Sequence, residues 1–199
     1  MISVILDNIR STYNVGAIMR TLDAVGGGAI VCCGITPYPE LAQDDDRSPV
    51  VQNANTRAIA KTALGAEQHL KISHQANTLD AVTAARENGV VAIALEQSPA
   101  AINVFDFSCP ADAQIALVLG GEVEGLDPEV MRICDEIVEI PQFGSKESLN
   151  VSVAAGIALY AMRAATGRNS AYTAGGAVAA TAGCACESGS SIVGHASVR

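Results

Sequence analysis

Tryptophan is absent from this chain of 199 residues, and aromatic residues make up only 4% of it. A strand-rich sandwich built on large aromatic anchors is therefore not expected, whereas 18 glycines suit an α/β fold with tight turns. Basic residues are also few, because 12 Lys and Arg stand against 21 Asp and Glu, a formal net charge of −9. This balance argues against an indiscriminate phosphate-coating protein. With 49% apolar residues, the chain can bury one sizeable core.

Long apolar runs and paired metal-binding cysteines are missing too, and we expect no secretory leader. The longest uncharged stretches, 148–162 and 169–186, fall short of about 20 continuous apolar residues, so we expect no membrane span. Met1 leads directly into a strand-like run, which predicts a cytoplasmic protein. Among six cysteines, Cys32 and Cys33 are adjacent in a strand candidate, and no C-x-x-C pair occurs. We expect buried or idle thiols, with neither disulfides nor a metal site.

Short β-branched runs alternate with helical patterns along the chain. Strands are predicted at residues 3–6, 29–33, 90–95, 115–119 and 137–140. An apolar spacing of about 3.6 predicts helices at residues 15–25, 56–64, 79–87, 128–134 and 149–165. The alternation predicts an α/β fold, with a mostly parallel sheet flanked by helices on both faces.

Two segments depart from this alternation. Residues 35–55 hold three prolines and an acidic run at residues 44–46, which predicts a long surface loop. Residues 167–199 consist mainly of Gly, Ala, Ser and Thr, and have too few large apolar side chains to offset the entropy of ordering. We therefore expect a folded domain at residues 1–166 and a disordered, small-residue-rich tail at residues 167–199.

The first motif that carries chemistry is N-V-G-A-I-M-R-T at residues 14–21, directly after the first predicted strand. A helix that begins near Asn14 would be capped by it, and Gly16 would permit a close backbone approach. Arg20 would lie about one and a half turns further along the helix. The alternative for Arg20 taken alone is an ordinary solvated helix residue.

The second motif is L-V-L-G-G-E-V-E-G-L at residues 117–126, a strand that runs straight into a glycine turn. Turns at the carboxyl ends of parallel strands expose backbone amides and carbonyls that can meet a small molecule. The motif lacks both the G-x-G-x-x-G spacing of dinucleotide sites and the Lys-Ser/Thr of a P-loop. A packing role for the glycines is the alternative.

The third motif is I-P-Q-F-G-S-K-E-S-L-N-V-S-V-A-A-G-I at residues 140–157, a strand end, a loop and an almost uncharged helix. Ser148 is the predicted cap of that helix, which leaves the Asn150 side chain to face a ligand. The small residues Ala154, Ala155 and Gly156 imply that another element packs closely against the helix. A buried core helix with an ordinary cap is the alternative.

Together and in this order, the three motifs resemble the SpoU (TrmH-type) branch of the SPOUT RNA methyltransferases, over residues 2–165. The resemblance implies an α/β sheet whose C-terminal segment threads a loop to form a deep trefoil knot, an exception to unknotted topology. It also implies S-adenosylmethionine as the cofactor, bound in the knot. The implied cofactor pocket is formed by the ends of three loops, at Leu95, Gly120, Ile140, Ser148 and Leu149.

The reaction implied by the resemblance is methyl transfer from S-adenosylmethionine to a ribose 2′-hydroxyl of RNA. We expect tRNA as the substrate, with rRNA as the nearest alternative. Arg20 would hold phosphate or ribose and stabilise the developing alkoxide, with base action as an option. Asn14 would orient Arg20 or the ribose, and Glu122 would hold the loops together. Ser148 and Asn150 would shape the space between methyl donor and acceptor.

Members of this branch work as homodimers through the knot region, with the arginine motif near the partner's cofactor. We therefore expect a homodimer that binds RNA and not DNA. A dimer would gather local positive charge around one RNA groove despite the acidic balance of the chain. The residues expected to supply that charge are Arg10, Arg20, Arg47, Arg57 and Lys61.

The chain departs from the pattern of this branch at two places. We expect no RNA-binding domain ahead of the first predicted strand, and therefore expect RNA recognition by the catalytic domain or by a partner protein. Gln142 stands where relatives often have Met, which alters the fine shape of the pocket. Two other classes stay open. One is a non-catalytic knotted module that binds RNA or cofactor, and the other is a generic nucleotide-binding α/β protein, for which no phosphate fingerprint occurs.

Overall fold

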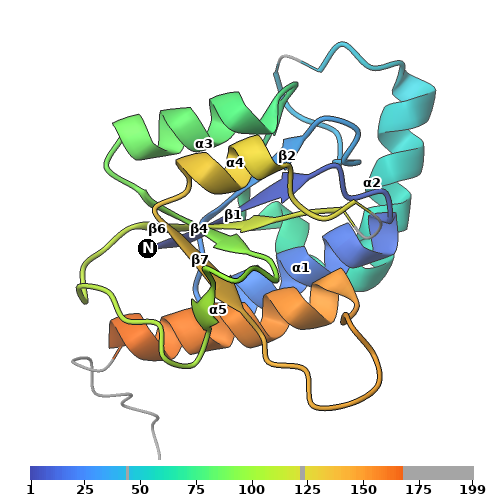
Figure 1. The fold of residues 1–199 in the computed structure, drawn as a ribbon. Helices are drawn as coiled ribbons and strands as arrows, with labels where there is room; N and C mark the ends of the chain where they lie inside the picture. The colour runs from blue at the N-terminus through green and yellow to red at the C-terminus, as the bar shows by residue number, and fades with distance from the viewer. Residues whose placement is uncertain (44, 122–123, 168–199) are drawn as a thin grey trace, which may run out of the picture.

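The computed structural model describes residues 1–43, 45–121 and 124–167, which form one sheet covered by helices (Figure 1). The strand order is β3-β2-β1-β6-β4-β7-β5, and the recorded strand pairs all run parallel. The strands are β1 (Ile2–Asp7), β2 (Ala29–Cys33), β3 (Lys71–Gln75), β4 (Val91–Leu95), β5 (Ile102–Asn103), β6 (Ile115–Leu119) and β7 (Glu136–Glu139). The helices are α1 (Thr12–Ala24), α2 (Pro49–Ala63), the 3₁₀ helix η1 (Ala66–Gln68), α3 (Thr78–Glu87), α4 (Pro128–Ile133) and α5 (Val151–Gly167).

The predicted α/β class with a parallel sheet is confirmed, and each predicted strand and helix is present. The strands β3 and β5 were not predicted from the sequence pattern. The predicted loop over residues 35–55 is too long, because α2 begins at Pro49 with Ser48 as its N-cap. Proline fits the first turn of a helix, where its missing N–H would have no partner. Residues 168–199, and with them nearly all of the predicted tail, lie outside the described residues.

The alternation of side chains along β1 divides the core into two layers. Val4 and Leu6 are buried with side chains of α1 and α5, whereas Ile5 belongs to the layer under α3 and α4. Figure 1 shows α3 and α4 on one face of the sheet and α1 and α5 on the other. Within the described part of the chain, no helix combines the length and apolar character needed to cross a bilayer.

Helix α1 is set closely against α2. A Cβ on Gly16 would strike Thr62 Oγ1 and the carbonyl oxygen of Ile59, so the close approach predicted for this glycine is confirmed and is made to α2. The predicted cap is wrong, because Ser11 and not Asn14 caps α1. The N–H of Asn14 donates to Ser11 Oγ at 3.3 Å, since the helix begins at Thr12.

The segment between β2 and α2 is fastened by Arg47. Its guanidinium donates to Asp45 Oδ2 at 2.6 Å and to the carbonyl oxygen of Tyr38 at 2.7 Å. The guanidinium also lies 3.4 Å from the centroid of the Tyr38 ring, which stacks on His74 with centroids 4.5 Å apart. These contacts hold the Arg47 side chain within its own loop. Arg47 is therefore not available to supply the positive charge that was expected from it around an RNA groove.

Candidate active site

Three turns adjoin at one edge of the sheet, because parallel strands end at the same edge. The strands β6, β4 and β7 are neighbours, and Leu95 at the end of β4 pairs with Leu119 on one side and Val138 on the other. Gly120 directly follows β6, and Ile140 directly follows β7. The structure therefore brings Leu95, Gly120 and Ile140 to adjoining strand ends.

Glu96 ties the turn after β4 to the turn after β6. Its Oε2 accepts a hydrogen bond from the N–H of Leu126 at 3.0 Å, and its Oε1 accepts one from the N–H of Gln97 at 3.0 Å. Gly125 has a φ of 68°, and a Cβ there would press on the Glu96 carboxylate. A Cβ on Gly120 would strike the backbone of Gly125. Glycine is thus required where this turn closes on itself and on Glu96.

Gln97 joins the turn after β4 to the loop after β7. Its Nε2 donates to the backbone carbonyl of Glu147 at 2.5 Å. At the start of the same loop, the side chain of Gln142 donates to the carbonyl of Ile140 at 2.9 Å. Residues 143–150, which lead from Gln142 to the start of α5, are exposed, and 97% of Phe143 is accessible to solvent. The loop is held at the sheet edge and at Glu147 and presents its other side chains to solvent.

The first and third motifs meet through Asn150. Its Nδ2 donates to Asn14 Oδ1 at 3.1 Å, and its Oδ1 accepts from the N–H of Ser152 at 2.9 Å. The prediction that Ser148 caps the last helix is wrong. Because α5 begins at Val151, the N-cap position falls to Asn150, and Ser148 lies in the exposed loop before it.

Arg20 lies apart from these turns. It is exposed on α1 and lines a hollow of about 480 Å³ together with Lys61 of α2 and Tyr160 of α5. Of the described residues, those that line this hollow include neither Gly120 nor Ser148. Within one chain, the expected catalytic arginine and the expected cofactor turns therefore occupy different places.

A second hollow, of about 430 Å³, lies at the carboxyl ends of β1 and β6. Asn8 and Arg10 line it from the segment after β1, opposite described residues of the second motif. The buried Asp7 anchors this wall, since its Oδ1 accepts from the Thr78 hydroxyl and from Asn8 Nδ2 at 2.9 Å. Glu122, the predicted catalytic carboxylate of the second motif, lies outside the described residues.

The thiols of the sheet and of the α4 terminus are not poised as nucleophiles. Burial raises the pKa of Cys33 to about 12 and the pKa of Cys134 to about 11, and it also raises the pKa of Cys32. These three thiols are therefore protonated at neutral pH. Over residues 1–43, 45–121 and 124–167, no group of three His, Cys, Asp or Glu side chains is placed to hold a metal ion.

Sequence reasoning missed Glu96 and Gln97, which link the three turns. Both follow β4 directly, and polar residues at the carboxyl end of a buried parallel strand are a usable signal for a ligand-binding edge. Asp7 stands at the same kind of position after a buried run in β1. A search for polar residues at each strand exit would have found all three.

The geometry of these motifs agrees with comparisons to known proteins. The sequence model of the SpoU rRNA Methylase family matches residues 47–160. The chain is 35% identical over 158 residues to the 23S rRNA (guanosine-2′-O-)-methyltransferase RlmB of Acinetobacter baylyi. The aligned region covers 78% of this chain and 56% of RlmB. The A. aeolicus TrmH/SpoU tRNA modifying enzyme superposes with a TM-score of 0.66 at 26% identity, covering 84% of this chain and 75% of that one.

A second solved structure, the AdoMet-bound rRNA methyltransferase from Sinorhizobium meliloti, superposes with a TM-score of 0.66 at 27% identity. That match covers 81% of this chain and 55% of the other. The chain spans about half the length of the curated relatives it matches, 56% of RlmB and 44% of a tRNA/rRNA methyltransferase of Mycobacterium ulcerans. From its motifs, its parallel sheet and these matches, the chain belongs to the SpoU rRNA Methylase family, in the SpoU (TrmH-type) branch of the SPOUT methyltransferases.

Proposed function

We propose that this chain is an S-adenosylmethionine-dependent RNA 2′-O-ribose methyltransferase. The observation that carries the proposal is the joining of the turns after β4, β6 and β7 through Glu96 and Gln97, together with the bond from Asn150 to Asn14 of the first motif. The relatives support the cofactor and the reaction. The S. meliloti structure is described as AdoMet-bound, and RlmB bears the name of a guanosine 2′-O-methyltransferase.

The described residues fit this cofactor. In the turn after β6, a Cβ at Gly120 has no room and Gly125 has a positive φ, so both positions present backbone without a side chain. Glycine at these positions lets a nucleoside approach the backbone closely. When bound, S-adenosylmethionine supplies an activated methyl group on a sulfonium. We assign the binding of S-adenosylmethionine to the backbone at Leu95, Gly120, Ile140, Ser148 and Leu149.

The acceptor is a ribose hydroxyl, a weak acid, so the protein must align it and stabilise the charge that develops on its oxygen. We assign that stabilisation to Arg20, because a guanidinium carries a permanent charge and several N–H donors for phosphate or ribose. Asn14 orients the ribose beside Asn150, and Ser148 shapes the space between donor and acceptor. We assign to Glu122 the role of holding the loops together.

A homodimer accounts for the distance of Arg20 from the turns of its own chain, because Arg20 would serve the cofactor pocket of the partner. Large apolar side chains are exposed where a second copy could cover them, at Phe143, Leu149 and Val153. Mixed dimers of Arg20→Ala and Asn150→Ala chains test this arrangement. We expect methyl transfer to return in the mixture, since one intact site forms across the dimer. If both residues act within one chain, the mixture stays as inactive as its parents.

The proposed knot is supported by the strand order. In the sheet, β7 lies between β4 and β5, although both precede it in the sequence. The connection over residues 96–114 therefore leaves β4, crosses to β5 beyond β7, and returns to β6 on the other side of β4. We propose that β7 and α5 pass through this loop, which would make the trefoil knot of the SPOUT fold.

We propose tRNA of the cytoplasm as the substrate. The chain spans 75% of the A. aeolicus relative, which is described as a tRNA modifying enzyme, but only 56% of RlmB. Ribosomal RNA is the second candidate, because the name of RlmB specifies 23S rRNA and the family model is one of rRNA methylases.

The proposed function is tested by incubating the full chain with methyl-labelled S-adenosylmethionine and, in separate reactions, total small RNA and ribosomal RNA. Label is expected at a ribose position that resists alkaline hydrolysis, because a 2′-O-methyl group blocks cleavage of the next phosphodiester. Label on a base would contradict the reaction type. Cofactor binding without transfer to either RNA would favour a non-catalytic knotted module.

A further inference from the structure

The hollow of about 430 Å³ at the carboxyl ends of β1 and β6 is separate from Arg20 and from the dimer contact. We call it the β1–β6 pocket. Its described lining includes neither Arg20 nor the apolar side chains assigned to the second copy, Phe143, Leu149 and Val153. Its volume lies in the range of about 300–1,000 Å³ that is usual for small-molecule sites. The pocket is therefore of a size to take a small ligand, and the proposed dimer does not use its lining.

A buried carboxylate faces this pocket with one oxygen that has no partner in the described chain. Asp7 is only 6% exposed, yet it lines the pocket. Its Oδ1 accepts from the Thr78 hydroxyl and from Asn8 Nδ2, whereas no described residue donates to its Oδ2. Among the described residues, no fully buried side-chain oxygen lacks a hydrogen-bond partner, so Oδ2 must be open to the pocket. An oxygen in this position requires a donor, which a ligand can supply in place of water.

Asn8 fixes the direction of this oxygen. Its Nδ2 donates to Asp7 Oδ1 at 2.9 Å, and its Oδ1 accepts from the N–H of Ile35 at 3.1 Å. Because both ends of its amide are engaged, Asn8 keeps the Asp7 carboxylate from turning. Asn8 itself has a φ of 54°, a left-handed conformation that is uncommon for residues other than glycine. Backbone strain of this kind is concentrated at binding and catalytic sites.

The charges around the pocket restrict what it can bind. Of the described residues that line it, Asp7, Glu124 and Asp127 are carboxylates and Arg10 is the cation. Arg10 is exposed and takes part in none of the ion pairs found in the described chain. An excess of carboxylates repels phosphate. The pocket therefore favours an uncharged ligand that offers N–H donors to a carboxylate and acceptors to a guanidinium.

Guanine meets this description among the four RNA bases. It presents the N1–H and N2–H donors along one edge and the acceptors O6 and N7 along another, where arginine makes its commonest specific base contact. Adenine and cytosine have an unprotonated ring nitrogen where guanine has N1–H, and uracil has a single N–H between two carbonyls. Ile35, which is 62% exposed, adds an apolar surface to the wall of the pocket for the flat face of a base.

The pocket shares a wall with a turn that is assigned to the methyl donor. Gly121 and Gly125, in the turn after β6, line the pocket. A Cβ on Gly121 would lie 3.1 Å from the carbonyl oxygen of Asn8, so the two walls of the pocket meet at this glycine. A Cβ on Gly125 would press on Glu96, which joins this turn to the turn after β4. The turn after β6 thus borders both the pocket and the residues that connect the cofactor turns.

We propose that the β1–β6 pocket binds the guanine base of the acceptor nucleoside and so selects guanosine for methylation. Asp7 Oδ2 accepts from N1–H and from the N2 amino group, and Arg10 donates to O6 and N7. The proposal rests on the proposed function, because it names the nucleoside whose ribose receives the methyl group. It assigns base selection to two side chains that lie outside the three motifs.

The test uses the full chain with its cofactor site filled by S-adenosylhomocysteine, so that a nucleoside cannot bind there. The Kd values of guanosine, inosine and adenosine are measured by NMR, from the shifts of the backbone amides of Gly121 and Gly125 in the pocket wall. Guanosine should bind about tenfold or more tightly than the other two. The reason is that inosine lacks the N2 amino group, and adenosine lacks both this group and N1–H.

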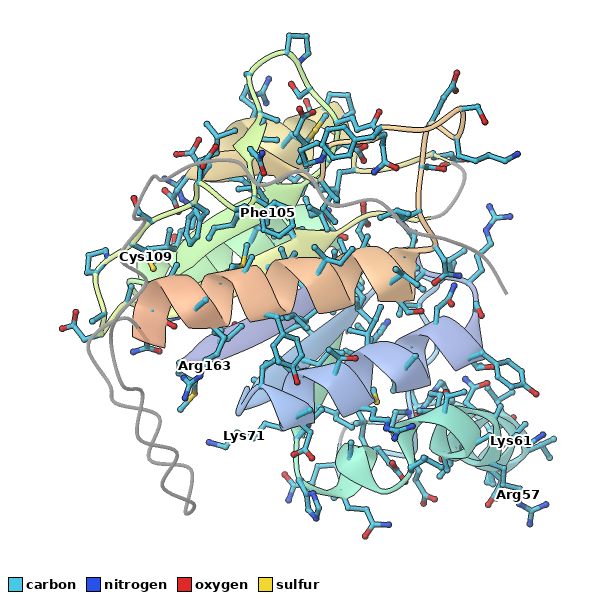
Figure 2. All side chains as sticks on the ribbon, turned by 90° about the horizontal axis from the view of Figure 1, so that it is seen from below. Arg57, Lys61, Lys71, Phe105, Cys109 and Arg163 are labelled. Carbon is cyan, nitrogen blue, oxygen red and sulfur yellow. The ribbon has the colours of Figure 1, made fainter. Side chains whose placement is uncertain are left out.

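Three variants separate the roles of the two side chains from a general loss of structure. Asp7→Asn keeps an acceptor for Thr78 and turns an amide donor into the pocket. It should weaken guanosine about tenfold and favour xanthosine, whose C2 carbonyl accepts from the new amide. Arg10→Gln, at an exposed position, should weaken guanosine by about three- to tenfold. Arg163→Gln is the matched control, because Arg163 is exposed toward the C-terminal end of α5 (Figure 2) and should leave every Kd at its wild-type value.

Equal Kd values of the three nucleosides in the wild type, or no shift at Gly121 and Gly125, would overturn the proposal. It would also be overturned by a preference for guanosine that survives Asp7→Asn, or by methyl label on the ribose of another nucleoside in RNA. Failure of the proposed function is distinguishable from these outcomes. In that case guanosine would still bind in the pocket, but the wild-type protein would transfer no methyl group to RNA.

Discussion

The side-chain amide of Asn150 donates to Oδ1 of Asn14 across 3.1 Å, although 136 positions separate the two residues. The same Asn150 caps α5 by accepting the N–H of Ser152 at 2.9 Å. One side chain therefore both fixes the start of α5 and holds it against the start of α1. Through this residue, the first motif of the chain is in contact with the last.

Removal of these contacts should be visible in stability. We expect Asn150→Ala to lower the free energy of unfolding by about 1–2 kcal/mol, because it removes a helix cap and a hydrogen bond. Asn14→Ala leaves the α5 cap in place and should cost about 1 kcal/mol. Urea denaturation followed by circular dichroism measures both, since the chain has no tryptophan for fluorescence.

The double variant Asn14→Ala/Asn150→Ala tests whether the two side chains interact with each other. A coupling energy of about 0.5–1 kcal/mol is expected from the cycle of the four proteins. Strictly additive effects would show that the two side chains do not interact. Ser145→Ala, exposed in the same loop, is the control and should change stability by less than about 0.5 kcal/mol.

Glu96 should act on cofactor binding without touching the reaction itself. Glu96→Ala leaves the Leu126 N–H without its carboxylate partner and loosens the turn after β6. We expect the affinity for S-adenosylmethionine to fall about tenfold in calorimetry, the equivalent of about one lost hydrogen bond. Glu96→Gln keeps an oxygen acceptor and should recover most of that affinity.

The rate of hydrogen exchange at the Leu126 amide is an independent measure of its hydrogen bond to Glu96. Exchange should accelerate in Glu96→Ala and stay slow in Glu96→Gln. Glu87→Ala, which removes an exposed carboxylate at the end of α3, is the control for charge. Wild-type cofactor affinity in Glu96→Ala would remove Glu96 from the account of the pocket.

The central strands could be predicted because their signals are local. The bounds of β2 and β6 follow directly from buried runs of apolar residues. By contrast, β3 has the sequence K-I-S-H-Q, alternates exposed and half-buried residues, and lies at the edge of the sheet. The strand β5 has only two residues. Neither carries enough burial to leave a pattern in the sequence.

The positions of caps and site residues depend on contacts that local sequence does not contain. Both Ser148 and Asn150 are good cap residues, and the choice between them agrees with a bond to Asn14 from the other end of the chain. The link from Glu96 to Leu126 likewise depends on the neighbouring positions of β4 and β6 in the sheet. The motifs predict which loops matter, and the sheet order determines which of them meet.

Gly16 and Gly156 provide a matched pair for the packing of α1. We expect Gly16→Ala to lower the free energy of unfolding by about 1–3 kcal/mol, because its Cβ would push α2 away at Thr62 and Ile59. Gly156→Ala in α5 should instead raise it by about 0.5–1 kcal/mol. Its Cβ would lie 3.8 Å from Thr21 Cγ2, an ordinary contact, and alanine favours the helix. Equal effects of the two changes in urea denaturation would contradict the close approach of α1 and α2.

The Asp45–Arg47 pair should make stability depend on pH. Hydrogen bonds from Arg47 hold the pKa of Asp45 well below its usual range. The unfolded chain therefore takes up a proton at Asp45 at higher pH than the folded protein does. The stabilisation is fully present above about pH 5 and is lost as the pH falls through the folded pKa.

Asp45→Asn removes this contribution. The difference in unfolding free energy between wild type and Asp45→Asn should be largest near about pH 7 and shrink toward about pH 3. Asp112→Asn, in an exposed turn, is the control and should show little pH dependence of that difference. A difference for Asp45→Asn that is constant with pH would show that Arg47 holds the loop without the charge of Asp45.

The central claim is that Arg20 stabilises the reacting ribose oxygen while the three turns hold the methyl donor. Its most direct test is single-turnover methyl transfer to RNA by Arg20→Ala, measured beside the affinity of the same protein for S-adenosylmethionine. The account predicts a rate lower by about a hundred- to a thousandfold, with cofactor affinity within about twofold of wild type. A rate near that of the wild type, with cofactor bound, would contradict it.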